Sequence, residues 1–218
     1  MPHNPNIKAV IFDFGGVFTT SPISNFAIYE KENGIPERFL GGVIKGNIND
    51  GSFAQFERAE ITIDEFDELF AAETKAAGHE VRGRTLVGLL KLKFYPEMIE
   101  TLSRIKQAGL QTGCITNNMA SHDSESMVSD SEDATELAAI FANFDEVIES
   151  SKVGMRKPEP RIYESMCKKL KRAPDECVFI DDLGINLKPA RAMGMETIRV
   201  PFDGVTPAVK ALNALLNL

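Results

Sequence analysis

The sequence has few of the residues that form disulfides and zinc sites. Its 218 residues include three cysteines and three histidines. The cysteines, Cys114, Cys167 and Cys177, form no Cys-x-x-Cys pair and have no histidine at zinc-ligand spacing, so we interpret them as small, reduced core residues. The strings GxSxG, GxxxxGK, GxGxxG and HExxH are also absent. Their absence argues against the serine hydrolase, P-loop, dinucleotide-binding and zinc-protease classes.

Basic residues are outnumbered, and no long apolar run occurs. Lys and Arg total 24 against 32 Asp and Glu, a formal net charge of −8. Because affinity for a phosphate backbone comes from basic surface, we predict no nucleic-acid partner. No apolar run approaches the roughly 20 residues of a membrane helix, and the polar segment Met1 to Lys8 lacks the pattern of a secretory signal. We therefore expect a cytoplasmic protein with no membrane association; its oligomeric state stays open.

The length of 218 residues indicates one large domain, or one domain with an insertion. Short segments rich in β-branched residues predict buried strands at Ala9–Phe12, Leu110–Thr116, Glu146–Glu149, Cys177–Ile180 and Thr197–Val200. Helical patterns lie between them, at Pro96–Ala108, Pro158–Leu170, Asn186–Met193 and Thr206–Leu216. This alternation predicts an α/β fold with a Rossmann-like parallel sheet and a functional site at the carboxyl ends of its strands.

Residues 21–95 contain helical patterns and no convincing strand. Helices are expected at Ile23–Asn33, Pro36–Lys45, Phe53–Glu60, Ile63–Ala77 and Leu86–Phe94. Thr62 and Glu65 form a capping box before the fourth helix, and Gly78 marks its end. We predict that residues 1–20 and 96–218 form the α/β core. Residues 21–95 would form an all-helical cap inserted after the first strand, with phenylalanines packed in a small core of its own.

The stretch from Ser121 to Glu136 carries six acidic residues and no basic one. It is too polar to be ordered by burial, so we expect a solvated loop or an exposed helix start. A cation site there would need its carboxylates to converge, and their spacing does not impose that.

Polar residues follow four of the predicted strands. They are Asp13 after the first, Thr116 and Asn117 after the second, Lys157 after the third, and Asp181 and Asp182 after the fourth. Each one alone is typical of a turn or a helix cap. Because a parallel sheet brings the carboxyl ends of its strands to one edge, the set predicts a site for a divalent cation and an anionic group.

Four segments carry a family resemblance. In chain order, VIFDFGGV (10–17), ITNN (115–118), GMRKPEP (154–160) and FIDD (179–182) resemble the four motifs of the haloacid dehalogenase superfamily. More narrowly, residues 143–163 and 178–195 resemble the N-terminal phosphatase domain of soluble epoxide hydrolase and the related domain fused to some acyl-CoA dehydrogenases. Residues 21–95 resemble the helical cap of that subgroup more loosely.

The resemblance implies a hydrolase that acts on small phosphate monoesters through an aspartyl-phosphate. Asp13 would be the nucleophile, which divides one difficult step into two. The cofactor would be Mg²⁺, held by Asp13, the backbone carbonyl of Gly15 and Asp182, because this ion prefers oxygen ligands.

The same resemblance assigns the phosphate-binding residues. Lys157 would supply a fixed positive charge, and Thr116 and Asn117 would hold the phosphoryl oxygens in line for attack. Asp13, Thr116 and Lys157 are therefore the implied catalytic residues. Asp181 would act through other groups. It would either orient Lys157 or accept a hydrogen bond from a metal-bound water.

One position departs from the family pattern. Superfamily phosphatases usually carry a second aspartate two residues after the nucleophile as general acid and base, and here that position is Gly15. Such a group contributes a factor of about 10² to 10⁴, so we expect slow turnover, a substrate with a good leaving group, or no physiological hydrolysis. A cap carboxylate, Glu30, Glu57 or Glu60, is the candidate replacement.

Two other functions stay open. Haloacid dehalogenases also attack with an aspartate and usually lack the second one, but they use no metal, and the pair Asp181 and Asp182 favours the magnesium-dependent reaction. A binding or regulatory module that keeps the fold and does little catalysis is the other, because a fold does not determine a function.

Overall fold

A five-stranded parallel sheet forms the centre of one half of the molecule. The computed structural model describes residues 3–20, 22–90, 93–117, 131–201 and 204–218. Its strands are β1 (Ala9–Phe12), β2 (Gln111–Thr116), β3 (Glu146–Glu149), β4 (Cys177–Asp181) and β5 (Glu196–Arg199). They lie in the order β3-β2-β1-β4-β5, with β1 pairing in parallel with both β2 and β4. The predicted α/β fold with a parallel sheet is confirmed.

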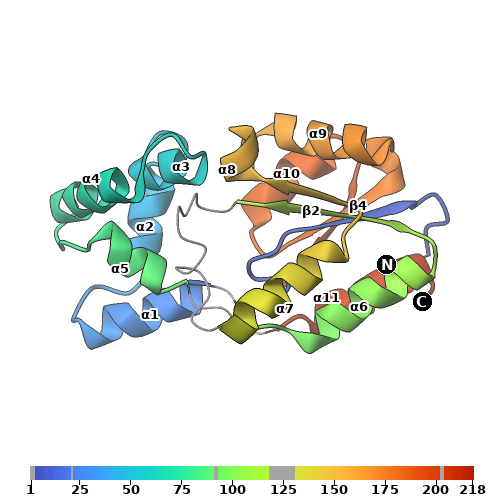
Figure 1. Cartoon of the computed structure of the whole chain (residues 1–218), viewed down its shortest axis with the longest axis horizontal. Helices are drawn as coiled ribbons and strands as arrows, with labels where there is room; N and C mark the ends of the chain where they lie inside the picture. Colours follow the sequence, from blue (N-terminus) through green and yellow to red (C-terminus); the bar gives the residue numbers. More distant parts are fainter. Residues whose placement is uncertain (1–2, 21, 91–92, 118–130, 202–203) are drawn as a thin grey trace.

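Helices cover both faces of the sheet (Figure 1). One face packs on α6 (Pro96–Gln107), α7 (Ser131–Ala142) and α11 (Thr206–Leu216), and the other on α9 (Pro160–Leu170) and α10 (Gly184–Ala192). Two short helices, α8 (Ser150–Val153) and the 3-10 helix at Pro174–Glu176, complete this half. Successive residues of β1 alternate between the two clusters, Val10 and Phe12 in one and Ala9 and Ile11 in the other. Among the described helices, none is both long and apolar enough to cross a membrane.

The acidic stretch from Ser121 to Glu136 is expected to be a solvated loop or an exposed helix start, and α7 begins inside it, at Ser131. Ile140 and the nearby Phe144 are buried in the core cluster, and they anchor the C-terminal part of the helix. The acidic stretch ends at Glu136. The apolar residues that attach α7 to the core come later in the chain, so the composition of the stretch does not distinguish a loop from a helix. Residues 121–130 of that stretch lie outside the described part of the chain.

Five helices lie between β1 and α6 and form the left half of Figure 1. They are α1 (Pro22–Glu32), α2 (Phe39–Gly46), α3 (Ser52–Glu57), α4 (Ile63–Ala76) and α5 (Gly83–Gly88). Their buried residues form a cluster of their own, which contains Phe26, Phe56, Phe66 and Phe70. The rings of Phe56 and Phe66 stack with centroids 4.5 Å apart. The predicted helical insertion with an aromatic core is confirmed.

The helix predicted over Leu86–Phe94 is wrong in its second half, because α5 ends at Gly88. Phe94 instead forms an antiparallel bridge with Thr19, and the backbone N–H of Tyr95 donates to the carbonyl of Phe18 at 2.8 Å. The N–H of Thr20 donates to the carbonyl of Lys93 at 2.8 Å. The chain therefore leaves the α/β half and returns to it through two paired segments.

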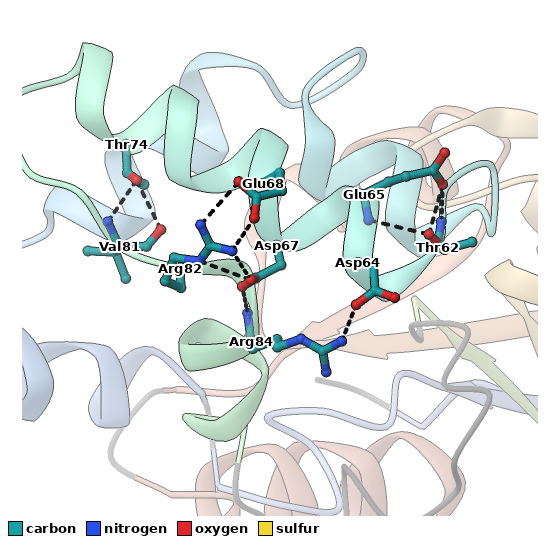
Figure 2. A network of polar contacts seen from close by, with 9 residues as sticks. All are labelled: Thr62, Asp64, Glu65, Asp67, Glu68, Thr74, Val81, Arg82 and Arg84. Carbon is teal, nitrogen blue, oxygen red and sulfur yellow. Dashed lines mark hydrogen bonds and ion pairs between the residues drawn. The ribbon is translucent and has the colours of Figure 1, made fainter.

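A polar network joins α4 to α5 inside the helical insertion (Figure 2). The capping box of Thr62 and Glu65 is present at the start of α4, as predicted. Asp67, 6% exposed, accepts hydrogen bonds from the backbone N–H of Arg84 at 2.8 Å and from Nε of Arg82 at 2.9 Å. Asp67 therefore stabilises the first turn of α5 and holds that helix against α4.

We predict that Asp67→Ala destabilises the insertion. The change leaves the N–H of Arg84 without its acceptor, which costs about 1–3 kcal/mol of unfolding free energy in a buried setting. The matched control is Glu68→Ala, because the Glu68 side chain also contacts Arg82 but is 73% exposed. Urea unfolding should show a clearly larger loss for Asp67→Ala; equal losses would contradict this role of Asp67.

Candidate active site

Three neighbouring strands deliver the predicted site residues to one edge of the sheet. Asp13 directly follows β1, Thr116 is the last residue of β2, and Asp181 is the last residue of β4, with Asp182 after it. All four are at most 7% exposed. Because β1 lies between β2 and β4, the carboxyl ends of the three strands are adjacent, which brings these residues together.

Lys157 reaches this edge from the segment between α8 and α9. Its ammonium Nζ lies 2.5 Å from Oδ1 of Asp13 and 3.0 Å from Oδ2 of Asp181, and its side chain is 1% exposed. The amide of Asn117 holds the Lys157 backbone at both ends, since Oδ1 accepts from the Lys157 N–H at 2.9 Å and Nδ2 donates to the carbonyl at 3.0 Å. In this structure the Asn117 side chain therefore positions Lys157. Asn118, which belongs to the same motif, lies outside the described residues.

Asp181 is fixed in turn by residues of α10. Its carboxylate accepts from Nδ2 of Asn186 at 3.0 and 3.1 Å and from the backbone N–H of Leu183 at 2.8 Å. The phenol O–H of Tyr163 donates to the Asn186 carbonyl at 2.8 Å. Asp181 is thus held in contact with the Lys157 ammonium. Sequence reasoning missed Asn186; its place in the first turn of a helix just after an aspartate pair was the available signal.

The site concentrates negative charge in a buried place. Ligand oxygens of Asp13, Asp181 and Asp182 lie within 4.8 Å of one another. Burial raises the pKa of Asp13 well above its usual value, Asp181 and Asp182 raise it further, and Lys157 opposes them. Burial also acts to lower the pKa of Lys157, but its two carboxylate neighbours outweigh that effect and keep it charged. Three carboxylates and one ammonium leave a negative centre, which fits a divalent cation bound through oxygen.

The two glycines after Asp13 differ in their surroundings. Gly16 has φ +76°, and a Cβ there would collide with the carboxylate of Asp182. A Cβ on Gly15 would meet no atom of the described residues within 4 Å. Close packing therefore requires glycine at position 16, whereas position 15 has room for a side chain.

The three cap carboxylates lie in different settings. Glu30 accepts from the backbone N–H groups of Arg38 at 2.7 Å and Leu40 at 2.8 Å, so it stabilises the start of α2. Glu60 is half exposed and pairs with Arg58 at 2.7 Å. Glu57 is 5% exposed, and its carboxylate contacts the guanidinium of a core arginine, Arg156. Of the three, within the described part of the chain, Glu57 is the one whose side chain contacts a core residue.

Comparisons with known proteins find similar chains along most of this sequence. A model of the haloacid dehalogenase-like hydrolases matches residues 7–194. The chain is 36% identical to acyl-CoA dehydrogenase family member 10 of Mus musculus, over 96% of this chain and 19% of that protein. It is 32% identical to bifunctional epoxide hydrolase 2 of Sus scrofa, over 89% of this chain and 36% of that protein. The chain thus spans well under half of each of these two relatives.

A relative of similar length is phosphatase MT3486 of Mycobacterium tuberculosis, 29% identical over 97% of this chain and 98% of that protein. Solved structures share the fold at lower identity. A haloacid dehalogenase family enzyme of Bacteroides thetaiotaomicron, in complex with magnesium and inorganic phosphate, gives a TM-score of 0.56 at 20% identity over 89% of this chain and 94% of that chain. L-2-haloacid dehalogenase of Xanthobacter autotrophicus gives 0.58 at 21% identity over 89% and 77%.

We predict that Gly16→Ala disrupts the site and that Gly15→Ala does not. An alanine at position 16 must adopt a positive φ, which costs about 1 kcal/mol or more, and must displace the Asp182 carboxylate. Thermal unfolding and a crystal structure of each variant provide the measurement. Equal stability of the two variants, with Asp182 in the same place in both, would refute the steric assignment.

Proposed function

Since the chain belongs to the haloacid dehalogenase-like hydrolase family, we propose that it is a magnesium-dependent phosphatase that acts on small phosphate monoesters. The observation that carries the proposal is the buried contact of Lys157 with Asp13 and Asp181, beside Asp182. A dehalogenase that displaces halide without metal has no need for three convergent carboxylates. The names of relatives such as phosphatase MT3486 support the same reaction class.

Mg²⁺ would be held by Asp13, Asp182 and the backbone carbonyl of Gly15. The negative charge of the site fits this ion, because burial and two neighbouring carboxylates already raise the pKa of Asp13. A bound Mg²⁺ would neutralise charge on the phosphate and keep Asp13 ionised. Gly16 leaves the space that the Asp182 carboxylate occupies.

The side chains of the chain itself account for the first step. Asp13 would attack phosphorus through a carboxylate oxygen, the P–O bond to the leaving group would break, and an aspartyl-phosphate would form. Lys157, fixed by Asp181 and by the Asn117 amide, would offset the charge of the incoming phosphate. The Thr116 hydroxyl at the end of β2 would hold a phosphoryl oxygen in line.

The absence of an acid at position 15 restricts the substrate. Without a proton donor beside Asp13, the leaving oxygen must depart as an anion, which is fast only when the leaving group has a low pKa. Water must then attack the aspartyl-phosphate without a base from position 15. The proposed enzyme is therefore slow on alkyl phosphates and faster on phosphates with good leaving groups.

Residues 21–95 would act as the cap that covers this site, while residues 1–20 and 96–218 form the catalytic core. The paired segments around Thr19 and Phe94 would serve as the hinge. Closure of the cap would exclude water and select the organic part of the substrate.

A first test measures hydrolysis of p-nitrophenyl phosphate with Mg²⁺, with chelator, and by Asp13→Asn. We expect chelator to abolish turnover and Asp13→Asn to lower kcat by at least about a thousandfold, as loss of a nucleophile does in other covalent catalysts. Asp175→Asn, an exposed carboxylate in the 3-10 helix, is the matched control and should keep full activity.

Other outcomes of this assay would redirect the assignment. Activity on 2-haloacids that survives chelator would make the protein a dehalogenase. Magnesium binding by calorimetry without turnover on a broad panel of phosphate esters would make it a binding or regulatory module.

A second test restores the missing acid with Gly15→Asp. Because position 15 has room for a side chain, we expect the variant to fold and to raise kcat on an alkyl phosphate by about 10²-fold, the low end of a general acid's contribution. The gain should be much smaller on p-nitrophenyl phosphate, whose leaving group needs no proton. Gly15→Asn, similar in shape but unable to transfer a proton, is the control; an equal gain with it would exclude acid catalysis as the cause.

A further inference from the structure

Arg156 connects the core to the helical insertion. It precedes Lys157 in the chain, and its Nη1 donates to the backbone carbonyl of Ile48, between α2 and α3. Its Nη2 contacts the carboxylate of Glu57, the last residue of α3. Beside this contact, the hydroxyl of Ser150 donates to the backbone carbonyl of Glu57 at 2.8 Å. Two points of the insertion are thus fastened to the residue next to the site lysine.

The contact between Arg156 and Glu57 is buried. Their side chains are 8% and 7% exposed, and Nε of Arg156 has no hydrogen-bond partner among the described residues. Buried ion pairs with incomplete hydrogen bonding are often no more stabilising than apolar residues of similar volume. Fold stability is therefore a poor explanation for an arginine at this position.

We propose that Arg156 is a positioning residue that couples closure of the insertion over the site to the placement of Lys157. The proposal rests on the function proposed above. The backbone of Lys157 is held by Asn117 on one side, and the preceding residue is held by the insertion on the other. Closing the insertion would fix the segment that presents the ammonium to Asp13, and opening it would release one of the two restraints.

The surroundings of Glu57 add a pH dependence to this contact. Burial raises the pKa of Glu57 to about 7, although Arg156, Lys157 and Arg58 oppose the shift. When the insertion opens, the carboxyl meets water and its pKa returns towards its ordinary value of 4.5. Closing therefore takes up a proton between these values. Its contribution to closing is fully present below pH 4.5 and is lost progressively as the pH rises from 4.5 to 7.

The test compares Arg156→Met with Arg156→Lys and with Arg161→Met, an exposed arginine nearby whose own partner is Glu159. With p-nitrophenyl phosphate and Mg²⁺, we expect Arg156→Met to raise KM about tenfold, as when the closed fraction falls to a tenth. kcat, measured well below the melting temperature, should stay close to that of the unaltered protein, whereas the melting temperature falls because Glu57 is left buried without its partner. Arg156→Lys should fall between, and Arg161→Met should change nothing.

A purely structural role would give a different pattern. Partial unfolding lowers the amount of active protein, so it reduces the apparent kcat and leaves KM unchanged. That result, or unchanged kinetics in Arg156→Met, would overturn the proposal.

A second readout does not need turnover. Spin labels at Leu69 on α4 and Lys168 on α9, both exposed, report the distance between the insertion and the core. Arg156→Met should broaden and lengthen this distance in the presence of Mg²⁺ and inorganic phosphate, and an unchanged distribution would count against coupling. If the unaltered protein hydrolyses no phosphate ester, the proposed function fails while this measurement still decides on the closure.

The pH readout uses Glu57→Gln, which keeps the shape of the protonated side chain. In the unaltered protein the spin-label distance should lengthen between pH 4.5 and 7, and in Glu57→Gln it should stay short. Identical pH profiles of the two proteins would remove Glu57 from the proposal.

Discussion

The buried ammonium of Lys157 is the constraint on which the site depends. A charge that is 1% exposed needs compensation, and the carboxylates of Asp13 and Asp181 supply it at 2.5 and 3.0 Å. Those carboxylates come from β1 and β4, so the strand order itself is required for the pairing. Asn117 and Asn186 then hold the lysine backbone and the Asp181 carboxylate in place. The two asparagines thus hold in place the groups that surround the Lys157 ammonium.

Much of the fold follows from local pattern. Four-residue apolar runs such as Ala9–Phe12 are buried on both faces and leave little choice but an interior parallel strand, and the residues after these strands must meet. Contacts between segments that are far apart in the sequence could not be predicted from local pattern. Glu57 and Arg156 acquire their partners only when distant segments pack, and no spacing along the chain marks their pairing. The polar composition around the start of α7 also left a loop and a helix equally open, because the residues that attach this helix to the core lie beyond the acidic stretch.

Gly15 and Gly16 are adjacent in the first motif, but packing constrains only one of them. Gly16 is set by packing, since any side chain there would strike Asp182. Gly15 is not, since a Cβ there would meet no described atom within 4 Å, so packing does not explain the absence of an acid at this position. Fold and reaction therefore constrain adjacent residues independently, which is why the family resemblance fixes the architecture more firmly than the substrate.

The central place of β1 has a consequence for how the chain folds. Ala9 pairs with Gln111 of β2 on one side and with Cys177 of β4 on the other. Neither pairing of β1 can form until long intervening segments of the chain bring these strands together. The helices between β1 and α6 bury their own aromatic cluster and make contacts that are close in sequence. Such local contacts form quickly, whereas parallel pairing over long loops is slow. The helical insertion would then fold before the sheet does, and it would hold β1 close to the position at which β2 and β4 later pair with it.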